Sequence, residues 1–158
     1  MAPTDALPNI AAVLAPVLAR VRRADQPMLV ALAERLAADR YRGWADEVRD
    51  EGQKAELRAC ARREEEIASR VEALRPDAAA IQQRLRAENP DLEDINRQLF
   101  AGRPLAQQFA IQAAGERLGA ATWRSFAEHD PAGRATFLAC AELEEASAAV
   151  LEAILSVR

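Results

Sequence analysis

The stretch ERLAADRYRGWA at residues 34–45 is repeated as ERLGAATWRSFA at residues 116–127. A second pair follows at almost the same offset, with LRACARREEEIASRVEAL at residues 57–74 and FLACAELEEASAAVLEAI at residues 137–154. The first pair lies 82 residues apart and the second 80. Because this difference arises between the two stretches, a loop is expected there in each unit. A helix–loop–helix unit that occurs twice predicts an all-α fold, a four-helix bundle with pseudo-two-fold symmetry.

The composition is that of one helical domain. The chain has 158 residues, half of them apolar and only 4 % aromatic, and Ala, Leu, Glu and Arg favour helix. Its net charge of −4 argues against nucleic acid as a partner. No apolar run reaches the roughly 18 residues that a membrane span needs. Two cysteines in such a chain are typical of reduced thiols, and we expect a cytoplasmic protein without a membrane partner.

Proline and glycine divide the chain into four parts. The connector between the units spans 28 residues, too many for a tight turn, and can carry the chain along the whole bundle. One such crossover makes the first and third long helices antiparallel. We expect a single domain over residues 1–158, with a helical extension at 1–25, a first hairpin at 27–75, a helical crossover at 76–103 and a second hairpin at 104–158.

Local signals predict where individual helices begin and end. We expect Gly52 to break the chain between the first two long helices, and Asp130-Pro131 to open the last one. The N-terminal helix, expected over residues 8–23, carries an apolar stripe that either the bundle or a second subunit must cover. We expect a homodimer. The stripe consists of Ile10, Leu14, Val17 and Val21.

Each long helix carries one glutamate at an equivalent place in the repeat. By the helical spacing of three and four residues, these glutamates share faces with apolar or small residues. A carboxylate on a buried face needs a metal ion, a proton or a hydrogen-bond donor. The candidate metal ligands are Glu34, Glu64, Glu116 and Glu144.

The chain resembles the ferritin-like superfamily, and rubrerythrin-type domains most closely. In that family a glutamate on the first and third helices is followed seven residues later by an aromatic residue, as Glu34 is by Tyr41 and Glu116 by Trp123. The second and fourth helices carry Glu-x-x-His followed by Ala, and the set holds two iron or manganese ions. In this chain Ile67 and Ser147 stand where the two histidines belong.

Two functions follow from this departure. In the first, the dinuclear site is degenerate, no cofactor is bound, and the protein is a non-ferroxidase scaffold or a module that binds a small ligand or a protein partner. Ile67 favours this function, because it replaces a donor with hydrocarbon. In the second, the four carboxylates and water hold hard cations such as Mg²⁺, Ca²⁺ or Mn²⁺, and the alternative is an oxidoreductase with a carboxylate-only site for two manganese or iron ions.

The remaining nucleophilic and imidazole groups are not expected to supply chemistry. Cys60 and Cys140 each precede a site glutamate by one helical turn on antiparallel helices, which places them about 12 Å apart along the bundle axis. That separation rules out a disulfide between them, and both should be buried. His129, the one histidine, is expected in a surface loop away from the glutamates.

Overall fold

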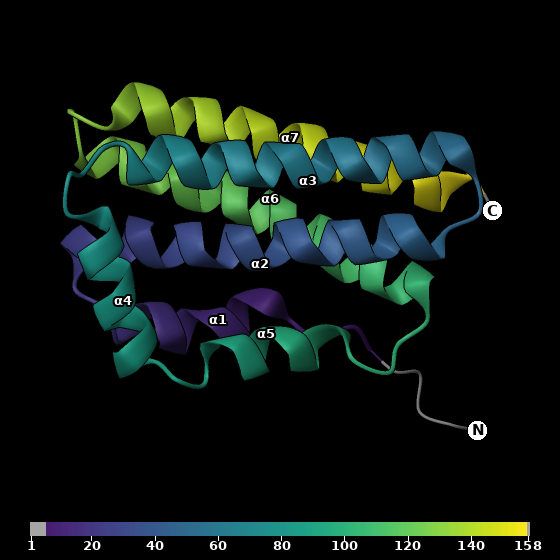
Figure 1. Cartoon of the computed structure of the whole chain (residues 1–158), viewed down its shortest axis with the longest axis horizontal. Coiled ribbons are helices and arrows are strands. Elements are labelled where there is room, and N and C mark those ends of the chain that lie inside the picture. Colours follow the sequence, from purple (N-terminus) through teal and green to yellow (C-terminus); the bar gives the residue numbers. More distant parts are fainter. Residues whose placement is uncertain (1–5, 158) are drawn as a thin grey trace.

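The computed structural model describes residues 6–157, and within that range the chain is all-α, with seven α-helices, one short 3₁₀ segment and no strand (Figure 1). None of these helices is both long enough and apolar enough to cross a membrane. In chain order the elements are α1 (Ile10–Ala19), η1 (Arg23–Asp25), α2 (Gln26–Glu47), α3 (Glu51–Glu72), α4 (Ala78–Glu88), α5 (Leu92–Phe100), α6 (Leu105–His129) and α7 (Arg134–Ser156).

The four long helices form a bundle of two antiparallel hairpins, α2 with α3 and α6 with α7 (Figure 1). Helices α4 and α5 carry the chain from the end of α3 to the opposite end of the bundle, where α6 begins. As a result α2 and α6 run in opposite directions, and so do α3 and α7 (Figure 1). Two helices thus connect the hairpins in the region where we expected a helical crossover, and α3 packs closely on α7.

Helices α3 and α7 begin at other residues than the sequence signals indicated. Oδ1 of Asp50 accepts the backbone N–H of Gln53 at 2.8 Å, so α3 begins at Glu51 and Gly52 lies in its first turn. The prediction that Gly52 breaks the chain was wrong, because this side-chain cap satisfies an amide of the first turn. Asp130 accepts the N–H groups of the two residues before α7 in a turn that precedes the helix, so α7 begins at Arg134, with Gly133 as its N-cap, and the prediction that Asp130-Pro131 opens it was wrong.

Helix α1 is shorter than expected, and the rest of the chain covers it. Asn9 caps its N-terminus, and the helix ends at Ala19. It packs on α5 and α6, where Ile10, Val17 and Val21 are buried and Leu14 is partly buried. The apolar stripe is thus covered within one chain. The homodimer stays a prediction that this packing does not test.

The hydrophobic core consists of two clusters, one toward each end of the bundle. The first contains Met28, Ile67, Trp123 and Phe137, and the second contains Tyr41, Trp44, Leu57, Phe109 and Leu151. In every long helix the site glutamate lies in sequence between residues of the two clusters. The bundle therefore holds a buried polar layer between two apolar ones.

Cys60 and Cys140 are both free and fully buried, as expected, and they lie in different core clusters. Burial raises the pKa of the Cys60 thiol and raises that of Cys140 to about 12. Both side chains are therefore protonated, packed groups at neutral pH.

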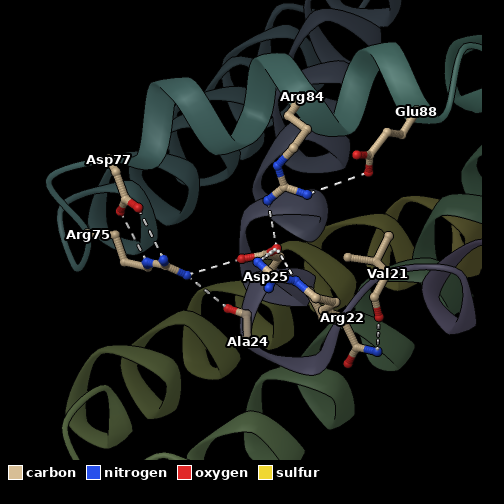
Figure 2. Close-up of polar contacts among 9 residues, drawn as sticks. Val21, Arg22, Ala24, Asp25, Arg75, Asp77, Arg84 and Glu88 are labelled. Atoms are coloured by element: carbon tan, nitrogen blue, oxygen red, sulfur yellow. Dashed lines mark hydrogen bonds and ion pairs between the residues drawn. The ribbon is translucent and has the colours of Figure 1, made fainter.

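A buried aspartate joins the first hairpin to the crossover (Figure 2). Asp25, at the start of α2, is only 1 % exposed and accepts hydrogen bonds from three arginines. Arg22 reaches it at 3.0 Å from the same segment, Arg75 at 3.2 Å from the end of α3, and Arg84 at 2.7 Å from α4. Three segments are thus tied to one carboxylate, which fixes how α4 sits against the bundle.

Candidate metal centre

The structure buries all four candidate glutamates near the middle of the bundle and brings three of them together. Carboxylate oxygens of Glu34, Glu64 and Glu144 lie within 4.8 Å of one another. None of the three is more than 7 % exposed. We refer to these three residues as the carboxylate trio. They come from α2, α3 and α7, so the fold assembles them from positions far apart in the sequence.

Glu116, the fourth candidate, is 1 % exposed and lies next to Glu64 and Glu144, but one of its oxygens is already engaged by two donors. The hydroxyl of Tyr41 on α2 donates to its Oε1 at 2.6 Å, and the amide of Gln112, one turn earlier on α6, donates to the same oxygen at 2.7 Å. Burial, followed by the negative charge of Glu116, raises the pKa of Tyr41 well above its ordinary value. The hydroxyl therefore keeps the proton that it donates. The other oxygen of Glu116 has no hydrogen-bond partner among the described residues.

Glu144 is positioned by an indole and by a glycine. The Nε1–H of Trp123 donates to its Oε1 at 2.9 Å. A Cβ atom at Gly119 would lie 2.6 Å from the same oxygen and 2.8 Å from the carboxyl carbon. The absent side chain at Gly119 leaves the space that the carboxylate occupies. The equivalent position in the first repeat is Ala37.

Glu64 is the most deeply buried member of the trio. It is 0 % exposed, and among the described residues neither of its oxygens accepts a hydrogen bond from an amide, indole, guanidinium or phenol group, so that its polar neighbours are the carboxyl groups of Glu34 and Glu116. Its equivalent, Glu144, receives the indole of Trp123 in the same hairpin, whereas Tyr41 reaches across to Glu116. The repeat is thus asymmetric at this point. A buried carboxylate with two unpartnered oxygens must be neutralised by a proton or by a cation.

The trio retains protons under conditions in which an exposed glutamate is ionised. Burial first, and the neighbouring carboxylates second, raise the pKa of Glu64 and Glu144 well above their usual range. Burial also raises the pKa of Glu34, although hydrogen bonds with Glu64 and Glu144 oppose this shift. Without a cation, three such groups cannot all carry charge at close range.

Arg40 is the cation that the fold places beside the glutamates. It forms no ion pair with any of the four candidate glutamates, and no other basic residue in the described part of the chain does so. Its guanidinium lies 3.9 Å above the Phe100 ring and donates to Asn96 and to Gln112. Burial lowers the pKa of Arg40 to about 10, while the negative charges around it, Glu116 included, oppose the shift. Arg40 therefore remains charged at neutral pH.

The two positions that would hold histidine in the resembled family offer no nitrogen ligand. Ile67 is fully buried in the hydrophobic core. The hydroxyl of Ser147 accepts a hydrogen bond of 3.0 Å from Nε of Arg63, and Nη2 of the same arginine donates to the Cys60 sulfur at 3.4 Å. His129 is exposed in the last turn of α6 and not in a loop, because α6 extends one residue further than expected. The centre therefore offers oxygen atoms alone.

An apolar cavity of about 260 Å³ opens onto this centre and was not foreseen from the sequence. It lies between α2 and α6, with α1 and α5 on its outer side. Glu34, Glu116, Glu144 and Arg40 line its polar end. Small residues at 33, 37, 115 and 119 on the two bundle helices were the one sequence signal for it.

Searches against protein-family models, curated proteins and solved structures found no match for this chain.

Proposed function

We propose that this protein is a ferritin-like bundle of the rubrerythrin type whose carboxylate trio binds one divalent cation without ferroxidase chemistry. The observation that carries the proposal is Glu64, whose two buried, unpartnered oxygens lie beside those of Glu34 and Glu144. The antiparallel α2 and α6 and the single crossover support the ferritin-like relationship (Figure 1).

The donor set suits a hard cation. Three carboxylates and no imidazole or free thiolate favour Mn²⁺, Mg²⁺ or Ca²⁺ over the nitrogen-containing sites that hold iron for oxygen chemistry. A divalent cation would balance two of the negative charges of an ionised trio, and the charge of Arg40 lies close by. Binding the cation would then release the protons that the glutamates otherwise retain, because the cation stabilises their ionised form.

A single ion is favoured over two because Glu116 is already engaged. Its Oε1 accepts hydrogen bonds from Tyr41 and Gln112, and Ile67 and Ser147 supply no nitrogen on either side. A second ion would have few ligands from the protein. This arrangement supports a degenerate form of the dinuclear site, as a binding module and not an oxidase.

The test is a titration of protein that has been treated with EDTA and dialysed. We expect calorimetry with Mn²⁺ to give one ion per chain and the thermal midpoint to rise with Mn²⁺ concentration. Fe²⁺ added in air should cause no enzymatic oxygen consumption. Glu64→Gln should abolish the Mn²⁺ response, whereas Glu65→Gln, at the next and more exposed position of α3, should preserve it. An absence of any cation response in the folded protein would overturn the proposal.

One observation favours a second candidate, an oxidoreductase with a carboxylate-only dinuclear centre of manganese or iron. Glu116 has one oxygen that accepts no hydrogen bond among the described residues, and its carboxyl group lies beside those of Glu64 and Glu144, where it could serve a second ion. In this case the titration would give two ions per chain, and Fe²⁺ in air would consume oxygen. The two outcomes differ in both stoichiometry and gas uptake.

The resemblance also leads us to propose a homodimer in the cytoplasm, where two buried thiols would remain reduced. Sedimentation at micromolar concentration tests the assembly. A species of 17.3 kDa alone would contradict the dimer.

A further inference from the structure

The cavity between α2 and α6 has the size and the wall of a site for a small apolar molecule. Its wall is mostly aliphatic and aromatic, and it includes Leu14 of α1, Leu29 of α2, Phe100 of α5 and Leu118 of α6. Cavities of roughly 150 Å³ with such walls remain free of water and take up benzene. At about 260 Å³ this cavity is larger by more than half, which suits a body of about ten carbon atoms.

The cavity extends from the surface of the molecule to its core. Ala11 and Ala15 of α1 line it and are both exposed, so its outer rim lies in solvent. Leu29 and Ala37 of α2 line it as well and are both buried. An apolar molecule can therefore enter beside α1 and lose its contact with water as it reaches the buried wall.

The uncharged polar side chains of the wall, and its one arginine, are engaged within the protein. Arg40 donates to Gln112 and to Asn96. The amide of Gln112 donates in turn to Glu116 at 2.7 Å. The hydroxyl of Thr122 donates to a backbone carbonyl of its own helix at 2.9 Å. These groups therefore need no hydrogen bond from a molecule in the cavity.

The carboxyl groups of the wall are in contact with other groups of the centre. Glu34 forms hydrogen bonds with Glu64 and Glu144. Glu144 also accepts the indole N–H of Trp123. The carboxyl group of Glu116 lies beside those of Glu64 and Glu144. What the cavity offers a ligand is therefore its apolar wall.

This wall selects a neutral ligand. A carboxylate would meet the glutamates of the wall, and an ammonium would meet Arg40. Either ion would lose its water in a mostly apolar cavity whose polar groups already have partners, which is costly. A hydrocarbon carries no such cost, and burial of its surface favours binding.

We propose that this cavity binds one small neutral hydrocarbon of about ten carbon atoms, held between α1, α2, α5 and α6. The proposal goes beyond the cation site and uses no polar contact with the carboxylate trio.

The test uses naphthalene as the probe and the full chain in buffer with EDTA. We expect calorimetry to give saturable binding of one naphthalene per chain, and the thermal midpoint to rise with naphthalene concentration. The anion 1-naphthoate and the cation 1-naphthylmethylammonium should each bind at least tenfold more weakly. A separate titration of the same preparation with Mn²⁺ measures the cation, so failure of either proposal is seen apart from failure of the other.

Substitutions that fill the cavity locate the binding. Ala33→Leu places a larger side chain in the wall and should weaken naphthalene binding at least tenfold, while Ala55→Leu, at an exposed position of α3 outside the cavity, should leave it unchanged. Ala15→Leu fills the cavity from α1 and serves as a second variant if Ala33→Leu does not fold. No saturable binding, equal binding of either charged probe, or unchanged binding by a folded cavity-filling variant would overturn the proposal.

Discussion

The hydroxyl of Tyr41 on α2 donates a hydrogen bond of 2.6 Å to Glu116 on α6. It is a buried contact that crosses between the two hairpins, although the equivalent residue, Trp123, bonds within its own hairpin. This difference leaves Glu64 without a phenol or indole donor and gives the Tyr41 donor to Glu116 instead. The centre is thus asymmetric because the Tyr41 hydroxyl bonds to the opposite hairpin, whereas the Trp123 indole does not.

Removing that hydroxyl tests the contact. We expect Tyr41→Phe to lower the free energy of unfolding by about 1–3 kcal/mol, because a buried carboxylate loses one of its two donors. Urea denaturation of the wild type, Tyr41→Phe, Glu116→Gln and the double variant forms a cycle that isolates the coupling. Additive effects of the two single changes would show that the hydrogen bond does not form.

Two glycines of α6 provide a matched pair of substitutions. In Gly119→Ala the new methyl group would displace the Glu144 carboxylate, so Mn²⁺ binding should weaken at least tenfold. In Gly115→Ala the new Cβ meets one Ile10 carbon at 3.4 Å, an ordinary contact. This control should bind Mn²⁺ normally and gain up to about 1 kcal/mol of stability from helix propensity. Equal Mn²⁺ affinity in both variants would contradict the position assigned to Glu144.

The pH dependence of stability should include a contribution from Asp25. Burial would raise its pKa, but hydrogen bonds and charge from Arg84 and Arg22 outweigh burial and lower the pKa below its usual value of 3.8. The folded state therefore binds fewer protons than the unfolded state in acid. The stability that Asp25 contributes is complete above its unfolded pKa and is lost as pH falls through the folded one.

Asp25→Asn should therefore be less stable than the wild type near pH 6, with the difference shrinking below about pH 4 as the wild-type carboxylate becomes protonated. Urea denaturation at a series of pH values measures this difference. Asp94→Asn is the control, because Asp94 is an exposed residue paired with Arg97 on α5 alone. A difference that grows toward acid pH would refute the prediction.

The cysteines report on whether the bundle is closed. Both thiols are fully buried, and burial raises the pKa of each, so little thiolate is present at neutral pH. We expect slow reaction with a coloured disulfide reagent in the native protein and rapid reaction of two thiols in guanidinium chloride. Rapid reaction of both thiols in the native protein would mean that the helix faces carrying Glu64 and Glu144 are not buried as described.

The repeat by itself indicated the helical hairpins and the burial of the four glutamates, and the length of the connector between the units indicated a crossover. Helical periodicity is a local property. The spacing around Glu34 or Glu64 therefore indicates which neighbouring residues share a helix face with that glutamate, independently of the rest of the chain. The apolar clusters on either side of the polar layer follow from the same spacing. Helix starts were predicted less well, because they depend on local side-chain hydrogen bonds, of Asp50 at the start of α3 and of Asp130 in the turn before α7, which the spacing does not describe.

Tertiary structure alone decided how the centre is arranged. The crossing of Tyr41 to Glu116, the position of Arg40 beside Gln112 and Asn96, and the cavity beneath α1 and α5 all depend on distances between helices far apart in the sequence. Such distances result from how side chains of different sizes fill the space between helices. The repeat places Tyr41 in register with Trp123 and Arg40 with Thr122, but it does not predict these distances. Equivalent positions contact different neighbours once the bundle is packed.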